Sequence, residues 1–246
     1  MRNSFLKLWF WGSLVTGLAL LAAPTPVLAA GGDLVPAFGT GGTVTSNPNG
    51  SDQQPLDIAI DATGIYISGS DAPGNDRWRV EKRDLTTGVL IPAFGAGGVV
   101  TENPSSDSDV AYDIAIDATG IYVVGADSVP GNLQWRIEKR DLITGALVPA
   151  FGTGGIVTEN PSTGFDVAYD IAIDATGIYV VGADSVPGNL QWRIEKRDLT
   201  NGNLLWPQTN NPGGNEDDIA RGVAVDSTGI YVVGDLYDVS GDNVWR

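Results

Sequence analysis

The chain of 246 residues contains neither cysteine nor histidine. Without them it cannot form disulfides, zinc sites built on thiolate or imidazole ligands, or nucleophile systems of the Ser-His-Asp and Cys-His types. A haem held by histidine is excluded for the same reason. Carboxylates are therefore the only abundant side chains suited to acid–base chemistry or to metal binding.

Positive charge is also scarce. The chain carries 14 Lys and Arg residues against 30 Asp and Glu residues, which gives a formal net charge of −16. A field of that sign repels nucleic acid and anionic lipid. It suits a cation or a basic partner, and it also serves solubility alone. We therefore expect a protein, a glycan or a cation as partner, with no nucleic acid and no membrane.

Only one long hydrophobic run is present, Leu8–Ala23, and it follows two positive charges near the start of the chain. With the small-residue pattern Val27-Leu28-Ala29 behind it, the run predicts a signal peptide over residues 1–29. The alternative is an uncleaved anchor, but the run is shorter than the ~20 residues that a membrane span needs. We expect the mature chain, residues 30–246, to be secreted to the periplasm or the cell surface.

A unit of about 57 residues repeats through the mature chain. The segment Asp109–Leu142 is identical to Asp166–Leu199, and looser copies flank this pair. A fixed period of this size is typical of solenoids and propellers. A tryptophan recurs at one position of each copy, and we expect these side chains to pack between repeats rather than to form a sugar-stacking ring: Trp78, Trp135, Trp192 and Trp245.

One repeat resembles a small antiparallel sheet. Asp113–Asp117 alternates polar and apolar residues, Ile121–Gly125 is a β-branched and aromatic run, and Trp135–Arg140 alternates again. In the last of these, Trp135 and Ile137 lie on one face, and Arg136, Glu138 and Arg140 lie on the other. The fourth strand is either Ala146–Phe151 or Ile156–Thr158, and the pattern does not decide between them.

These repeats predict an all-β fold, a β-propeller of about four blades. The mature chain begins in a segment that corresponds to the outer strand of a repeat, and it ends in a segment that corresponds to the third strand. We therefore expect Asp33–Phe38 to pair with Asn243–Arg246 and close the ring. The competing interpretation is an open piece of a longer propeller.

Two motifs carry a resemblance to known bacterial repeats. Leu34–Val44 resembles the delta-60 repeat of secreted bacterial proteins, as do Ile91–Val99 and Val148–Ile156. The core Ala115–Gly125 is similar to the SBBP-type β-propeller repeat. The resemblance implies a secreted bacterial propeller and no particular activity. The last copy departs from it, because Trp206–Thr209 replaces Pro-Ala-Phe-Gly.

The most acidic and variable loops join successive repeats, or join the second strand to the third. In a four-stranded meander both sets emerge at one end of the sheets, so we expect them to share one binding face. The carboxylates that we expect there are Asp107, Asp109, Asp127, Asp166, Asp184, Glu216, Asp217 and Asp218. Hard oxygen ligands of this kind suit calcium, although none follows the spacing of an EF-hand loop. The candidate calcium ligands are Asp127, Asn132, Asp184, Asn189, Asp235, Asp238 and Asp242.

Three functions fit the pattern. The leading one is a secreted, non-catalytic and monomeric module that binds or scaffolds through acidic loops, with calcium as the one cofactor in view. The second is a glycoside hydrolase or lyase that uses paired carboxylates. The third is a structural repeat fragment of a larger adhesin or surface protein. Because two copies are identical, no single residue in them is set apart for chemistry, which favours the first function.

Overall fold

The computed structural model describes residues 32–47, 50–129, 131–186, 188–210, 216–237 and 243–245. This part of the chain contains β-strands and no helix. In particular, no helix in it is long and apolar enough to cross a membrane. The all-β prediction is confirmed, whereas the predicted signal peptide lies outside the described residues.

The strands form four antiparallel sheets, in which neighbours along the chain are hydrogen-bonded neighbours in space. The first sheet contains β1 (Gln53–Asp61), β2 (Gly64–Asp71), β3 (Arg77–Arg83) and β4 (Val99–Glu102). The second contains β5 (Val110–Asp117), β6 (Gly120–Asp127), β7 (Gln134–Arg140) and β8 (Ile156–Glu159). The third contains β9 (Val167–Asp174), β10 (Gly177–Asp184), β11 (Gln191–Arg197) and β12 (Leu204–Asn210). The fourth contains β13 (Ile219–Asp226), β14 (Gly229–Tyr237) and β15 (Asn243–Trp245).

A carboxylate fixes the tight turn between the first two strands of each sheet. In the second sheet, Asp117 Oδ1 accepts hydrogen bonds from the Thr119 amide at 2.7 Å, the Thr119 hydroxyl at 2.7 Å and the Gly120 amide at 3.1 Å. This is the local chemistry that favours Asp at the start of a turn. The same residues recur in every copy, so all four hairpins have one geometry.

The fourth strand of the second sheet is Ile156–Glu159, and the alternative, Ala146–Phe151, is wrong. The Val148 amide bonds to the Lys139 carbonyl, but the chain then turns away, with the Phe151 amide returning to the Val148 carbonyl at 3.0 Å. Gly155 continues the turn at a φ of +100°, which L side chains rarely adopt. The glycine-rich segment therefore delays the strand by several residues.

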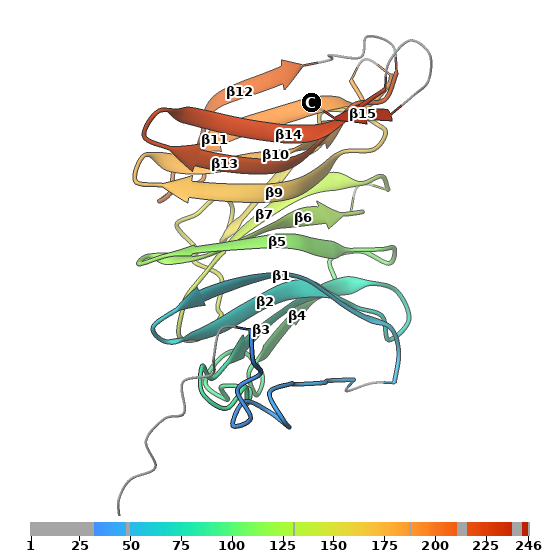
Figure 1. Cartoon of the computed structure of the whole chain (residues 1–246). Coiled ribbons are helices and arrows are strands. Elements are labelled where there is room, and N and C mark those ends of the chain that lie inside the picture. The colour runs from blue at the N-terminus through green and yellow to red at the C-terminus, as the bar shows by residue number, and fades with distance from the viewer. Residues whose placement is uncertain are drawn as a thin grey trace, which may run out of the picture.

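The sheets stack in chain order, with the innermost strands β1, β5, β9 and β13 side by side (Figure 1). The first and fourth sheets stand at opposite ends of this stack. Ring closure is not confirmed. Within the described residues β15 pairs with β14, while Gly39 donates to the Thr87 carbonyl at 2.8 Å, so the expected pairing of Asp33–Phe38 with Asn243–Arg246 is not present.

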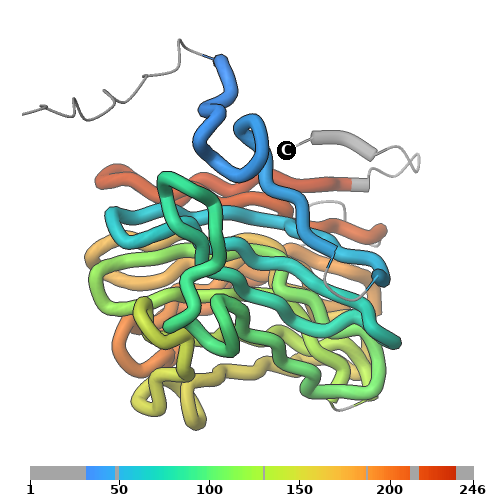
Figure 2. The backbone as a smooth tube through the Cα atoms, turned by 90° about the horizontal axis from the view of Figure 1, so that it is seen from below, coloured from blue at the N-terminus to red at the C-terminus, as the bar shows by residue number. Residues whose placement is uncertain are grey.

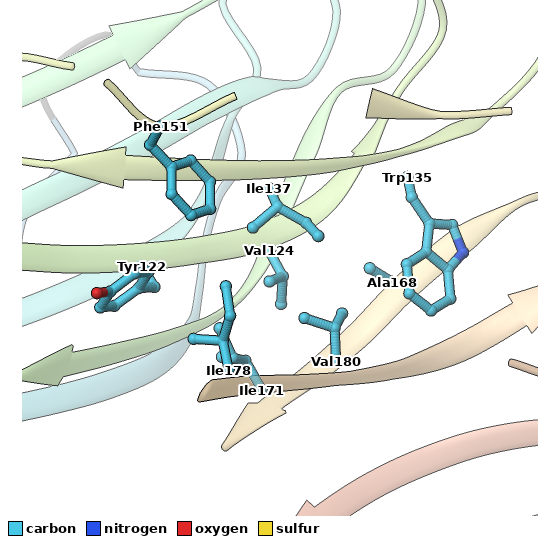
Figure 3. Packing of buried hydrophobic residues seen from close by; sticks show 9 residues of the cluster. All are labelled: Tyr122, Val124, Trp135, Ile137, Phe151, Ala168, Ile171, Ile178 and Val180. Atoms are coloured by element: carbon cyan, nitrogen blue, oxygen red, sulfur yellow. The ribbon is translucent and has the colours of Figure 1, made fainter. Parts of the chain in front are cut away.

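Each sheet presents its forward face to the next sheet along the chain and its rear face to the preceding one. Between the second and third sheets, the forward face supplies Tyr122, Trp135 and Phe151, and the rear face supplies Ile171 and Ile178 (Figure 3). All five are almost fully buried. Because both faces of the second and third sheets are buried against a neighbour, the core lies between the sheets rather than within any one of them.

A tryptophan indole joins each pair of sheets. Trp78 Nε1 donates to the Ala126 carbonyl at 2.9 Å, Trp135 to Ala183 at 2.9 Å, and Trp192 to Asp235 at 3.0 Å. A buried indole N–H needs such a partner. The prediction that the repeated tryptophans pack between repeats is thus confirmed for these three junctions, and the side chain of Trp245 lies outside the described part.

At the first junction a glycine of the second sheet lies close to the tryptophan ring. A Cβ added to Gly125 would lie 3.0 Å from Trp78 Cζ2 and 2.0 Å from the Val110 carbonyl oxygen. A glycine recurs at this point of each second strand, at positions 69, 125, 182 and 234. At each of these positions an added Cβ would lie 1.9–2.1 Å from a carbonyl oxygen of the preceding strand, so the close approach of the two strands explains this glycine.

We predict that Trp135→Ala lowers the free energy of unfolding by roughly 3–5 kcal/mol, because it empties the junction and leaves the Ala183 carbonyl unpaired. Trp135→Phe, which keeps most of the ring, should cost less. Trp206→Ala is the matched control, since Trp206 is exposed on β12 and should change stability little. Urea unfolding of the three variants measures the differences, and equal effects of Trp135→Ala and Trp206→Ala would contradict the assignment.

Candidate binding surface

The two sets of acidic loops lie together at one end of the strands, along the same edge of all the sheets, as expected. At the first junction, the Asp109 amide donates to the Asp76 carbonyl at 2.9 Å, and Asn75 Nδ2 donates to the Asp107 carbonyl at 2.6 Å. The Ser108 hydroxyl adds a bond of 2.7 Å to Asp76 Oδ2. We call this end the loop rim: the loops β2–β3, β6–β7 and β10–β11, together with the loops that join successive sheets.

The bracing repeats at the next two junctions. The Asp166 amide donates to the Leu133 carbonyl at 3.2 Å, and the Asp218 amide donates to the Leu190 carbonyl at 2.8 Å. Asn132 and Asn189 add side-chain bonds to Gly164 and Glu216 carbonyls, at 3.0 and 2.5 Å. At each of the three junctions, described residues of one loop are therefore hydrogen-bonded to the loop beside it.

Most of the carboxylates expected to bind a partner are buried within the rim. Asp109 accepts hydrogen bonds from the Ser105 amide at 3.0 Å, the Ser105 hydroxyl at 2.7 Å and the Ser128 amide at 3.1 Å. Asp166 makes the same bonds with Ser162 and Ser185. Burial raises the pKa of Asp166, and these hydrogen bonds oppose the rise. Both residues therefore tie an inter-sheet loop to the loop beside it.

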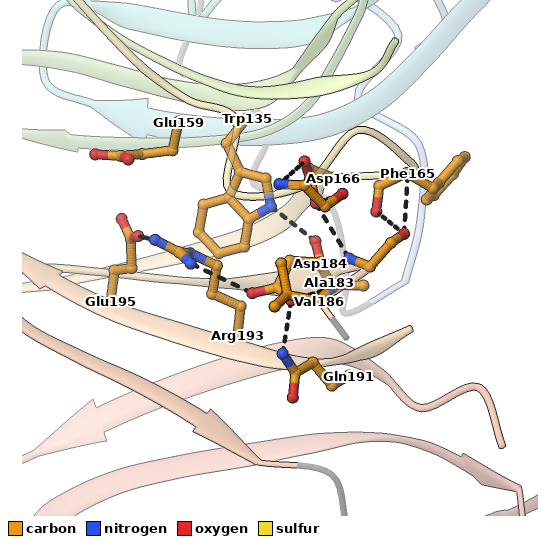
Figure 4. Close-up of polar contacts among 12 residues, drawn as sticks. Trp135, Glu159, Phe165, Asp166, Ala183, Asp184, Val186, Gln191, Arg193 and Glu195 are labelled. Carbon is orange, nitrogen blue, oxygen red and sulfur yellow. Dashed lines mark hydrogen bonds and ion pairs between the residues drawn. The ribbon is translucent and has the colours of Figure 1, made fainter. Parts of the chain in front are cut away.

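Asp127 and Asp184 begin a chain of buried ion pairs. Asp127 accepts a bond from Gln134 at 2.6 Å and pairs with Arg136 at 3.1 Å. Arg136 and Arg140 then engage the two oxygens of Glu138, each at 2.6 Å. The third sheet repeats this arrangement, and Figure 4 shows Asp184, Arg193 and Glu195. These carboxylates are neutralised inside the protein.

The charged face of the third strand was predicted, but its surroundings were not. The guanidinium of Arg136 lies over the Trp78 ring, 5.4 Å from its centroid, and Arg193 lies over Trp135 at 5.5 Å. The rear face of one sheet thus buries its arginines against the tryptophan of the preceding sheet. Such cation–π contacts are stronger where water is excluded.

Three of the eight expected carboxylates remain exposed, and the others are buried. The buried ones are Asp109, Asp127, Asp166, Asp184 and Asp218. The exposed ones are Asp107, Glu216 and Asp217. Asp217 Oδ1 also accepts the Leu190 amide at 2.8 Å, so it is anchored as well as exposed.

The calcium candidates do not assemble into a common site within the described part of the chain, where no group of three acidic side chains is placed to hold a metal ion. Asp235 pairs with Arg221 at 2.7 Å, and Asn132 and Asn189 point their amide nitrogens at carbonyls. Asp238 and Asp242 lie outside the described residues. Calcium binding therefore stays a prediction.

Sequence reasoning missed a row of side chains on the inner strands. Tyr112 and Tyr169 pack with ring centroids 5.2 Å apart, and the Arg221 guanidinium lies 4.8 Å from the Tyr169 centroid. Tyr112, Tyr169 and Arg221 each follow the alanine of a β-bulge. At the bulge the register shifts, and the residue has no partner in the pairing with the neighbouring strand. Burial raises the pKa of both tyrosines, and Arg221 opposes the rise. The signal was available, since a Tyr-Asp pair recurs at this point in the two identical copies.

A second row, of aspartates, joins the inner strands to one another. Asp113 Oδ2 accepts the Ile171 amide at 2.7 Å, and Asp170 Oδ2 accepts the Val223 amide at 2.5 Å. Asp57 makes the same contact with Ile114 at 3.3 Å. Burial, followed by hydrogen bonding with the neighbouring carboxyl groups Asp170 and Asp57, raises the pKa of Asp113 to about 10. Burial and the neighbouring carboxyl groups therefore favour the protonated form of Asp113.

The chain was compared with known protein families and with curated proteins. No family model matches it, and no curated protein matches it. The resemblance to delta-60 and SBBP-type repeats therefore stays a prediction, and the function has to be argued from the geometry.

We predict that the free energy of unfolding decreases as pH rises from the ordinary Asp value of 3.8 towards about 10, because the folded state holds a proton on Asp113 that the unfolded state releases. Asp113→Asn mimics the protonated group and should flatten this dependence while keeping an oxygen for the Ile171 amide. Asp84→Asn, which removes a carboxylate from the turn after β3 and leaves the row intact, is the control. Urea unfolding between pH 5 and pH 9 (roughly the range that these pKa values span) gives the slopes, and an unchanged slope in Asp113→Asn would refute the assignment.

Proposed function

We propose that this chain is a secreted, non-catalytic binding or scaffold module that presents the loop rim to a partner. The observation that carries the proposal is the bracing of each rim loop by the next, through the same bonds at three successive junctions. Binding residues are typically held on loops that a rigid scaffold positions. A surface that is already ordered loses little conformational entropy when it binds.

The carboxylates in the cavities favour binding over hydrolysis. A cavity of about 290 Å³ on the first sheet contains Glu81, whose two oxygens are engaged by Arg79 and Arg83, each at 2.5 Å. A second cavity, of about 690 Å³, contains Asp127 and Glu159, which pair with Arg136 and Arg197. A glycoside hydrolase needs one carboxyl group that donates a proton and a second that acts as base or nucleophile. Carboxylates held by guanidinium groups are poorly suited to donate a proton.

The aspartate row is equally unsuited to hydrolysis. Asp113 has the raised pKa of a general acid, but it is 8% exposed and its two oxygens accept the amides of Ile114 and Ile171. The bond from Ile171 joins adjacent sheets, so the raised pKa is a consequence of packing. We therefore assign this row to the structure of the stack and not to a reaction.

The chemistry of the rim favours a positively charged partner. Asp107, Glu216 and Asp217 are exposed on it, and the chain as a whole carries a net charge of −16. Complementary charge raises the association rate and selects against acidic partners. We propose a basic segment of another protein as the partner, with a divalent cation as the smaller alternative.

We predict that a lysine-rich peptide binds the full chain and that an acidic peptide of equal length does not. Removing the three exposed rim charges, by Asp107→Asn, Glu216→Gln and Asp217→Asn together, should weaken binding about tenfold, as expected for the loss of some 1.4 kcal/mol of electrostatic attraction. Fluorescence anisotropy of labelled peptides at low salt gives the dissociation constants.

The matched control removes three charges that do not belong to the loop rim, by Asp33→Asn, Asp84→Asn and Asp141→Asn. Asparagine can still accept the amide bonds that Asp84 and Asp141 make in their turns. An equal loss in both triple variants would mean that net charge alone attracts the peptide, and the rim proposal would fail. Thermal unfolding in Ca²⁺ and in Mg²⁺ at matched ionic strength tests the cation, which requires a rise specific to Ca²⁺.

A further inference from the structure

The fourth sheet and the N-terminal segment each show only a part of the four-stranded repeat. Within the described residues the fourth sheet has three strands, β13, β14 and β15, whereas each of the other sheets has four. The N-terminal segment Leu34–Val44 has the sequence and bonding of an outer-strand segment without the three strands that accompany it elsewhere. Its Gly39 amide donates to the Thr87 carbonyl at 2.8 Å, just as the Gly95 amide donates to Thr144 at 2.8 Å.

The rear face of the first sheet is an unfilled junction. Ile58 on β1 is 61% exposed, whereas the residues at the same position in the next two sheets, Ile114 and Ile171, are 4% and 6% exposed. The N-terminal segment covers only one part of this sheet (Figure 2). The cavity of about 290 Å³ lies here, between the Phe38 side of that segment and the sheet residues around Ile65.

The complete junctions show which side chains would cover the rear face of the first sheet. At the junction of the first and second sheets, the same positions are covered by Tyr66, Trp78 and Phe94, all of which are at most 1% exposed. At the open junction Phe38 occupies the place of Phe94, because Gly88 approaches its ring just as Gly145 approaches that of Phe94. The tyrosine and the tryptophan have no counterpart there. The open junction therefore matches the inner three strands of another such repeat.

The forward face of the fourth sheet has the exposed residues that would complete the open junction. Tyr231 is 53% exposed and Val233 is 60% exposed, whereas Tyr122 and Val124, their equivalents in the second sheet, are fully buried. This face and the open junction belong to the same repeating contact but stand at opposite ends of the stack (Figure 1).

We propose that the partner of each end is a second copy of this chain. The forward face of the fourth sheet in one copy would pack on the rear face of the first sheet in the other, and repeat the junction that the fold already contains three times. In the second sheet Trp135 pairs with Glu159. By repeat position, Trp245 would pair with Ser46, so that Thr43–Ser46, rather than Asp33–Phe38, supplies the fourth strand.

This contact is heterologous, because two different surfaces meet. Heterologous contacts form rings when the rotation closes and filaments when it does not. Two copies contribute eight sheets, which is within the range of about four to eight blades in propellers. We therefore expect a closed dimer in place of the monomer that the sequence suggested.

The mass of the full chain in solution tests the proposal, measured by size-exclusion chromatography with light scattering over a wide range of concentration. The expected mass is twice that of the protomer. Ile58→Asp on the first sheet and Val233→Asp on the fourth should each give a monomer. Ile143→Asp is the matched control: Ile143 is 67% exposed in a turn where the other copies have threonine, and this variant should remain dimeric.

Mixing the two monomeric variants separates this contact from any symmetric one. Ile58→Asp keeps an intact fourth sheet and Val233→Asp keeps an intact first sheet, so their mixture can form one unaltered junction and should recover a species of dimer mass. That recovery also shows that both variants are folded. A wild-type chain that stays monomeric, a dimer that survives both substitutions, or a mixture that stays monomeric would each overturn the proposal.

Discussion

The hydrogen bond from a buried tryptophan indole to a carbonyl of the next sheet is the contact on which the rest of the structure depends. It occurs at all three junctions with lengths of 2.9–3.0 Å. The indole fills the space between two sheets, and at the first junction Gly125 lies directly against it. Because both faces of an internal sheet are buried, no sheet has an independent core, and stability is a property of junctions rather than of single repeats.

The buried charge follows from the same stacking. The rear face of each internal sheet carries arginines, and the preceding tryptophan covers them. Such a face is acceptable only because Asp127, Glu138 and their equivalents satisfy the guanidinium groups. The second and third sheets, whose cores are identical in sequence, are the two that have neighbours on both sides. Each of them therefore has one face that fits the sheet before it and another that fits the sheet after it.

The sequence predicted the first three strands of each repeat, the turns, the position of the tryptophans and the end at which the loops gather. These depend on local patterns of period two and on turn residues. The role of the acidic residues was not predictable in the same way. Asp109 and Asp107 differ by two positions, yet one is buried under three hydrogen bonds and the other is exposed. Likewise, the aspartate row depends on contacts between strands of different sheets, and closure depends on the angle between sheets, which no local pattern records.

Hydrogen exchange of the indole N–H groups, followed by NMR, tests the central claim most directly. If the junctions determine stability, the indoles of Trp78, Trp135 and Trp192 should exchange only through global unfolding, with one common free energy, while the exposed Trp206 exchanges rapidly. The claim would be contradicted if Trp135, at the middle junction, exchanged as fast as Trp206, because the sheets would then separate without unfolding.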